Sequence, residues 1–156
     1  MSIKVPPPGT RGIPFPRLPG WLARIMSRMQ LRQFRRNRGG HTQGGLHALM
    51  LETVGARSGD PRSAMLGYTE EGPDSWLVVA SLAGAARHPG WLYNLARQPQ
   101  ATIEFGDGRR VSVRAETLDG PELDAAWARL NTEAPEYAKY KTKTDKQLPV
   151  IRLRQA

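Results

Sequence analysis

A polar turn with two arginines is the part of the sequence best suited to bind an anion. It reads Gly55-Ala56-Arg57-Ser58-Gly59-Asp60-Pro61-Arg62. The backbone amides of such a turn and two guanidinium groups can converge on a phosphate or a carboxylate. The same spacing fits a plain polar hairpin whose arginines are solvated. The turn lacks the Gly-Lys-Ser/Thr of a nucleotide-binding loop and does not open a helix, so a P-loop is excluded.

A second candidate region lies where a predicted strand ends and a helix follows. The strand ends in small or apolar residues, which would let the backbone approach a flat ring: Val79, Ala80, Ser81 and Leu82. On the helix, Trp91 and Asn94 are three residues apart and therefore share a face. Asn94 offers both a hydrogen-bond donor and an acceptor. Trp91 fits a hydrophobic core as readily as a ring-binding site.

Hydroxyl groups are the remaining candidates for chemistry. Tyr137 and Tyr140 share a helical face, where they either pack against the domain or donate a proton or hydrogen bond to a substrate. Ser58 and Ser81 lack a nucleophile elbow and an orienting base, so the sequence does not indicate a serine hydrolase.

Thiol and metal chemistry find no support in the sequence. The chain has no cysteine, which excludes disulfides, thiolate ligands and cysteine nucleophiles and is compatible with a reducing cytoplasm. His41, His47 and His88 are widely spaced and form no ligand pattern, so no metal site is expected. A redox function would therefore need a bound organic cofactor.

The elements that must position these residues are short strands joined by tight turns. We expect strands at residues 46–54, 63–68, 76–81, 101–105, 111–118 and 148–153. Turns are expected at residues 55–62, 70–74 and 106–108. Hairpin links impose antiparallel pairing, so the chain is predicted to be mainly β, a small antiparallel β-barrel with helices outside.

Helices are predicted within and after this series of strands. A short helix over residues 89–97 ends before Pro99. Asp119 is expected to cap a longer helix that Pro135 interrupts, and a further helix begins at Glu136. These helices are the elements that would carry Trp91, Asn94 and the two tyrosines.

The net charge of +9 is concentrated at the N-terminus. The first 45 residues hold nine Lys or Arg and no acidic residue, and six of the 13 prolines fall in the first twenty. This composition predicts three parts: an extended, largely disordered leader over residues 1–20, a basic amphipathic helix over residues 21–38, and a barrel domain over residues 46–153.

The helix over residues 21–38 has an apolar stripe and an arginine face. The stripe consists of Trp21, Leu22, Ile25, Met26 and Met29. The other side carries Arg24, Arg28, Arg32 and Arg35. The stripe either packs on the barrel and leaves the arginines solvated, or inserts into an anionic membrane surface that the arginines attract. No nucleic-acid partner is expected, because aromatic residues are sparse and no recognition motif follows.

The location of the protein follows from what the sequence lacks. No apolar run approaches the roughly 20 residues of a membrane span, and no signal peptide is recognisable. We expect a cytoplasmic protein. Peripheral attachment to the inner face of the cell membrane is a further hypothesis.

Together these segments resemble the deazaflavin-dependent nitroreductase and quinone reductase family of split β-barrel proteins, which use coenzyme F420. The resemblance covers roughly residues 21–153. It rests on residues 53–62, Ala80-Ser81, His88-Pro89-Gly90-Trp91-Leu92-Tyr93-Asn94-Leu95, Tyr137-Ala138-Lys139-Tyr140 and Thr144-Asp145-Lys146-Gln147-Leu148-Pro149.

The resemblance implies an oxidoreductase that transfers a hydride from reduced F420 to an electron-poor acceptor, quinone-like or nitroaromatic. Residues of the turn would meet the phosphate and glutamyl carboxylates of the cofactor: Arg57, Ser58, Gly59 and Arg62. Residues farther along would border or support its ring: Met65, Leu66, Gly67, Val79, Ala80, Ser81, Leu82, Gly90, Trp91, Asn94 and Tyr137. The hydroxyls of Ser81, Tyr137 and Tyr140 would stabilise the charge that develops during reduction.

The sequence departs from the family pattern at several positions. Ala56 and Leu82 stand where relatives often carry basic residues, so weaker anion binding is expected. Met65, Gly67, Ala134 and Lys143 stand where proline or aromatic residues are usual, which alters the acceptor pocket. Related split barrels bind flavin mononucleotide, so a flavin protein or a non-enzymatic binding module is the alternative. The resemblance allows a monomer or a homodimer.

Overall fold

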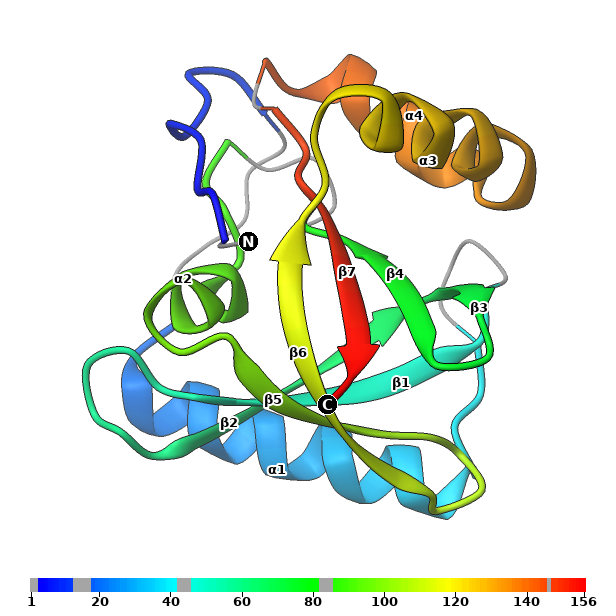
Figure 1. Ribbon diagram of the computed structural model, residues 1–156. Coiled ribbons are helices and arrows are strands. Elements are labelled where there is room, and N and C mark those ends of the chain that lie inside the picture. The colour runs from blue at the N-terminus through cyan, green and yellow to red at the C-terminus, as the bar shows by residue number, and fades with distance from the viewer. Residues whose placement is uncertain (1–2, 13–17, 42–45, 82–85, 146) are drawn as a thin grey trace.

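One curled antiparallel sheet organises the fold (Figure 1). The computed structural model describes residues 3–12, 18–41, 46–81, 86–145 and 147–156. The strands are β1 (Ala48–Val54), β2 (Pro61–Gly67), β3 (Thr69–Gly72), β4 (Ser75–Val79), β5 (Gln100–Glu104), β6 (Arg110–Thr117) and β7 (Val150–Gln155). Their order across the sheet is β2-β1-β5-β6-β7-β4-β3. This confirms the predicted antiparallel split barrel.

Both faces of β1 and β4 are buried along their apolar stretches, which explains why these stretches are unbroken, whereas the middle strand β6 alternates buried and exposed residues. In β1, Leu49 and Leu51 belong to the cluster inside the curled sheet, whereas Ala48 and Met50 belong to a cluster on its outer face. β4 alternates in the same way, with Val78 inward and Val79 outward. A strand covered on two sides needs apolar residues at every position rather than at every second one.

Four helices cover the sheet (Figure 1): α1 (Gly20–Arg36), α2 (Gly90–Arg97), α3 (Gly120–Glu133) and α4 (Pro135–Lys143). α2 buries Trp91, Leu92 and Leu95 in the inner cluster. α3 and α4 cover the outer face of β4 and β7, and α1 runs along the outer side of β1 and β2.

The sequence predicted six strands and a turn over residues 70–74, and this prediction missed one strand. Residues Thr69–Gly72 form β3, which pairs with β4, and the turn is confined to the residues after it. The acidic residue Glu71 reads as a turn residue in the sequence. It lies in β3, where the pairing with β4 shifts register, and Arg152, which is distant in the sequence, donates to its carboxylate at 2.6 and 2.8 Å.

Asp119 occupies the N-cap position of α3 as predicted, but its side chain does not cap the helix. The carboxylate accepts a hydrogen bond from Lys4 Nζ at 2.8 Å instead. The leader supplied the competing donor, which the local sequence around the helix could not reveal.

The leader is in contact with the barrel. Residues 3–12 contain no helix or strand, yet Ile3 and Val5 pack on the inner cluster. Gly9 N donates to Ala86 O at 2.8 Å, and Thr10 and Arg11 donate to the carboxylate of Asp145. The described part of the leader is therefore extended and held at several points.

Of the two alternatives for α1, the structure does not show the one in which the apolar stripe packs on the barrel. Trp21 and Met29 are 66% and 63% exposed, and Ile25 and Met26 are exposed as well. The side of α1 that faces the sheet is a second line of residues at helical spacing: Ala23, which is exposed, Ser27 and Leu31, which are half-buried, and Phe34, which is buried. Its small members let the helix approach β2, and Ser27 Oγ donates to Ser63 O at 2.9 Å.

An ion pair fixes α1 in this orientation. Arg35 donates two hydrogen bonds to Glu104, at 2.9 and 3.0 Å, and the Glu104 side chain is only 8% exposed. Arg110 donates to the same carboxylate at 2.7 Å. A buried carboxylate requires such partners. If α1 turned its apolar stripe inward, Arg35 would move away and Glu104 would lose its two hydrogen bonds from that residue.

Candidate functional site

The turn between β1 and β2 is tight and needs its glycines. Gly55 N donates to Asp60 O at 2.8 Å, and Gly59 N donates to Gly55 O at 2.9 Å. A Cβ on Gly55 would lie 2.8 Å from Ser58 Oγ, and Gly59 has a φ of +76°. Both positions therefore favour glycine. In Figure 1 the turn lies between α2 and the N-terminal part of α1.

Asn94 ties this turn to α2. Its Oδ1 accepts a hydrogen bond from Ala56 N at 2.9 Å, and its Nδ2 donates to Thr53 Oγ1 at 3.0 Å. The amide thus uses both the donor and the acceptor that the sequence indicated. Its partners in the structure are the turn and the end of β1, so it positions the 55–62 turn.

A pocket of about 300 Å³ lies on the α2 side of the turn. Arg57 and Ser58, two of the residues predicted to bind an anion, line it together with Arg97 and Gln98. Arg57 and Arg97 are both exposed, and neither has an ion pair within the part of the chain that the structure describes. Two unneutralised guanidinium groups around one pocket are suited to a phosphate or carboxylate.

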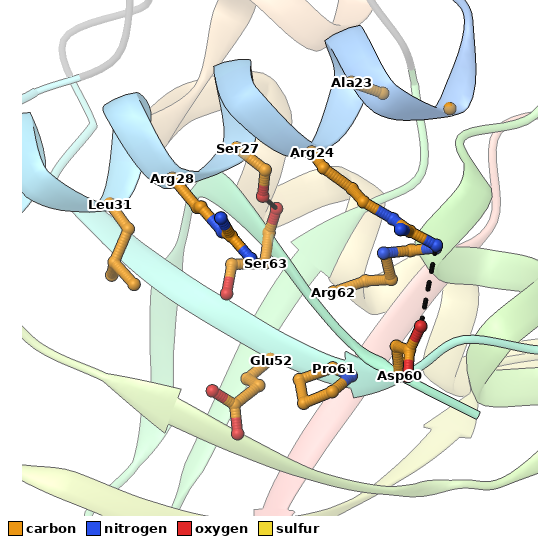
Figure 2. Close-up of a pocket in the computed structure, with 11 residues that line it drawn as sticks. Ala23, Arg24, Ser27, Arg28, Leu31, Glu52, Asp60, Pro61, Arg62 and Ser63 are labelled. Carbon is orange, nitrogen blue, oxygen red and sulfur yellow. Dashed lines mark hydrogen bonds and ion pairs between the residues drawn. The ribbon is translucent and has the colours of Figure 1, made fainter. Parts of the chain in front are cut away.

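A larger pocket, of about 670 Å³, lies on the other side of the turn, between α1 and β2 (Figure 2). Arg62 lines it from the strand, and Arg24 and Arg28 line it from the helix. Arg62 Nη2 is 3.4 Å from Ser58 Oγ, a long hydrogen bond. The two pockets place arginines on both sides of the 55–62 turn.

The residues predicted to border a ring are divided among different surfaces. Leu66, Ala80 and Trp91 pack in or on the inner cluster. Met65 lies against the α1 cluster, and Val79 lies under α3 and α4. Neighbouring strand residues point to opposite faces, so the side chains of consecutive residues cannot all face one ring.

The other members of that predicted set lie close to these. Gly67 pairs with Ala48 and is buried, and Ser81 is buried directly after β4. Gly90 is the first residue of α2. Leu82 lies outside the described residues.

Tyr137 and Tyr140 lie on α4, away from the turn (Figure 1). Their rings meet edge to face at 6.1 Å, and both pack on the cluster that contains Val79. Burial raises the pKa of Tyr137 to about 12 and also raises the pKa of Tyr140. Tyr137 is therefore protonated at neutral pH and can donate a hydrogen bond, but it releases its proton reluctantly.

Sequence reasoning missed four residues that line the two pockets: Arg24, Arg28, Arg97 and Gln98. Arg97 lies three residues after Asn94 and so shares its helical face, a pattern that could have been noticed. The approach of Arg24 and Arg28 to the turn depends on which side of α1 is buried, which the sequence left open.

Comparison with known proteins identifies the family. The model of the F420H(2)-dependent quinone reductase family matches residues 25–155. The chain belongs to this family. An F420H(2)-dependent quinone reductase of Mycobacterium tuberculosis is 36% identical over 107 residues, which cover 67% of this chain and 70% of the relative. The predicted F420-dependent oxidoreductase class is confirmed, and the flavin alternative is not favoured.

Solved structures agree with this membership in the quinone reductase family. An F420H2-dependent reductase is 32% identical with a TM-score of 0.61, covering 69% of this chain and 93% of its own. A structure described as a domain-swapped dimer is 29% identical with a TM-score of 0.63, covering 85% and 99%. Within the described residues, no helix is long and apolar enough to cross a membrane, and no cluster of three or more metal-ligating side chains occurs.

Proposed function

We propose that this protein reduces a quinone-type acceptor with reduced coenzyme F420, and that the 55–62 turn anchors the cofactor. The observation that carries the proposal is the pair of arginine-lined pockets on the two sides of that turn. The cofactor carries a phosphate and glutamyl carboxylates, so it needs several cationic partners along one path. The donor set around the turn fits that need.

Arg57 and Arg97 form the first anchoring point. The family's usual second basic residue is replaced by Ala56, and Arg97 lines the same pocket from the end of α2. A guanidinium from the helix thus substitutes for the missing charge in the turn. The Ser58 hydroxyl and the backbone amides of Arg57 and Ser58 supply the neutral donors, because the amides of Gly55, Ala56, Gly59 and Asp60 already donate within the structure.

The ring is proposed to lie where the end of β4 meets the start of α2. Ala80, Ser81 and Gly90 provide small, closely approachable backbone there, Trp91 supports it from the inner cluster, and Met65 to Gly67 and Val79 remain proposed neighbours. When bound, the reduced deazaflavin supplies the hydride. The protein's part is to hold donor and acceptor in line and to exclude water.

Three hydroxyls are proposed to serve the acceptor. Ser81 is buried beside the proposed ring position, and Tyr137 and Tyr140 lie on α4. A tyrosine whose pKa is raised to about 12 stays protonated, so Tyr137 would donate a hydrogen bond to a developing oxyanion.

Titration of the purified protein with F420, followed by the fluorescence of the cofactor, tests the proposal. We expect saturable binding and, with reduced F420, oxidation that depends on added menaquinone or a soluble quinone analogue. No binding at tens of micromolar F420 would overturn the proposal. A yellow protein that retains flavin mononucleotide would favour the flavin alternative instead.

We also propose that the exposed stripe of α1 binds an anionic membrane surface, where lipid-soluble quinones reside. Trp21, Ile25, Met26 and Met29 form an apolar strip on the solvent side of the helix. Arg36 continues the same side toward the C-terminal end of α1, and so does Arg32, although the sequence-based prediction wrongly placed it on the opposite side. Apolar residues followed by arginines complement a bilayer with anionic headgroups.

Co-sedimentation with vesicles tests this second proposal. Vesicles containing anionic lipid should bind the full chain, and the double variant Trp21→Ser/Met29→Ser should bind several-fold less. Tyr93→Ser, which removes an exposed aromatic residue from α2, is the matched control. Equal sedimentation of wild type and double variant would rule out membrane binding through α1. Deleting residues 1–40 is a poorer test, because it also uncovers Met50 and removes Arg35 from Glu104.

A further inference from the structure

The pocket between α1 and β2 has an excess of positive charge that the folded chain does not neutralise. Three arginines and two carboxylates line it. One carboxylate, Glu52, already lies 3.6 Å from Arg110, which does not line the pocket. The other, Asp60, lies 3.6 Å from Arg24, in a contact between side chains that are each more than half exposed. Arg28 has no ion pair among the described residues.

The arginines of this pocket come from two elements and point into one space. In Figure 2, Arg24 and Arg28 extend from α1 toward the strand, and Arg62 extends from the strand toward Arg24. Like charges that approach one another raise the free energy of the folded state unless an anion lies between them. Ser27 and Ser63, which line the same pocket, add neutral polar groups at its floor.

The pocket is continuous with the anion-binding turn. Asp60, Pro61 and Arg62 line it and also end the 55–62 turn. The pocket of Arg57 and Arg97 lies on the other side of the same turn. A flexible polyanion held at Arg57 would therefore reach the α1 arginines by crossing the turn at Arg62.

We propose that Arg24 and Arg28 of α1 bind the γ-glutamyl carboxylates of the cofactor tail and make the protein selective for long-tailed F420. This inference rests on the proposed function and adds a role for α1 within it. The helix then has two sides with separate tasks. Its inner arginines bind the cofactor tail, and its outer stripe faces the membrane.

The number of glutamates on the cofactor provides the test. The protein is titrated in lipid-free solution with F420 that bears several glutamates and with the tail-free form that keeps the phosphate, and binding is followed by fluorescence. Wild type should bind the long-tailed form about fivefold more tightly, since two exposed ion pairs contribute about that much. The preference should shrink with added salt.

Three double variants of the same helix separate the tail site from the general charge of α1. Arg24→Gln/Arg28→Gln should bind both forms equally, with the affinity for the tail-free form unchanged. Arg32→Gln/Arg36→Gln removes the same charge from the outer side and should keep the fivefold preference. Arg24→Lys/Arg28→Lys should keep most of the preference, because the charges remain. All of these side chains are exposed, so helicity and unfolding midpoint should match wild type.

The results separate this inference from the proposed function. Binding of both cofactor forms with equal affinity by wild type would overturn the tail site and leave the proposed function standing. If Arg24→Gln/Arg28→Gln still preferred the long-tailed cofactor, the tail site would likewise be overturned and the proposed function would stand. Failure of wild type to bind either form would overturn the proposed function, and the tail site with it.

Discussion

Arginines on the two sides of the barrel have opposite surroundings. On the β7 side, Arg152 is only 9% exposed and lies within 2.9 Å of three carboxylates, those of Glu71, Glu116 and Glu122. Around the 55–62 turn, arginines line open pockets, and among these pocket-lining arginines only Arg24 has an ion pair within the described residues, with Asp60 at 3.6 Å.

The comparison shows how one residue type serves structure or binding. A buried guanidinium must be fully paired, because an unpaired charge in the interior costs several kcal/mol. The charge of a buried, paired guanidinium is then neutralised by carboxylates of the same chain. An exposed guanidinium has no such requirement and keeps its hydrogen-bond donors for a ligand. Paired and unpaired arginines contribute equally to the net charge of the sequence, so only their surroundings in the structure distinguish them.

Replacing Arg152 should have the largest effect and should affect stability alone. Arg152→Leu leaves three carboxylates together without their cation, so we expect a loss of about 3 kcal/mol in unfolding free energy. Urea unfolding measures it, and F420 affinity of the folded variant should be unchanged. A large loss of affinity without loss of stability would break the distinction between the two sets of arginines.

Glu104→Gln should destabilise the attachment of α1 by about 2 kcal/mol, because Arg35 and Arg110 lose a charged acceptor. The hydrogen bond from Arg35 holds the pKa of Glu104 below its ordinary value of 4.5. The unfolded state therefore binds the proton more readily, so this stability is complete above about pH 4.5 and is lost as pH falls through the lower folded-state pKa.

Urea unfolding at pH 7 and at about pH 3 checks both parts of this prediction. The acid-induced loss should be smaller in Glu104→Gln than in wild type. Glu133→Gln, which removes an exposed partner of Arg129 on α3, is the matched control and should change little. Equal effects of the two substitutions would contradict a special role for Glu104.

Arg57→Gln should weaken F420 binding about tenfold, the worth of one charge-assisted hydrogen bond, and Arg97→Gln about threefold. Neither should alter the unfolding midpoint, because both residues are exposed. Fluorescence titration measures the affinities. Ala56→Lys in the Arg97→Gln background should restore most of the loss. No recovery would show that Arg97 does not replace the missing basic residue.

Asn94→Ala should have a mixed and smaller effect. It removes the hydrogen bonds to Ala56 N and Thr53 Oγ1, so we expect a loss of about 1 kcal/mol in stability and about threefold in F420 affinity. Unfolding and fluorescence titration of the same preparation measure the two losses. Unchanged affinity with reduced stability would make Asn94 a purely structural residue.

Ionisation of Tyr137 should have no visible effect on the rate across the ordinary range. With a pKa raised to about 12, Tyr137 remains protonated below about pH 10. Tyr137→Phe should lower the rate of quinone reduction by a constant factor between about pH 6 and pH 10 if the hydroxyl donates to the acceptor. A factor that varies with pH in this range would contradict the raised pKa.

Much of the fold could be predicted from local patterns. The hairpin at Gly106-Asp107-Gly108, the short helix ended before Pro99 and the antiparallel barrel follow from turn residues and short apolar runs. β3 was missed because its residues are typical of a turn, whereas its pairing with β4 and the hydrogen bonds from Arg152 to Glu71 are contacts that the local sequence does not reveal. The candidate turn and Arg57 could be found from residue type, whereas Arg24 and Arg28 depend on the packing of α1.

The sequence by itself determined the family, the barrel and the cationic character of the 55–62 turn, because these depend on residue type and on short spacings. Only the tertiary structure decided which side of α1 faces the barrel. The helix has two apolar lines, and the buried carboxylate of Glu104, supplied by a strand far along the chain, selects the line next to Arg35. That choice turns Arg24 and Arg28 toward the turn and leaves Trp21 and Met29 outside.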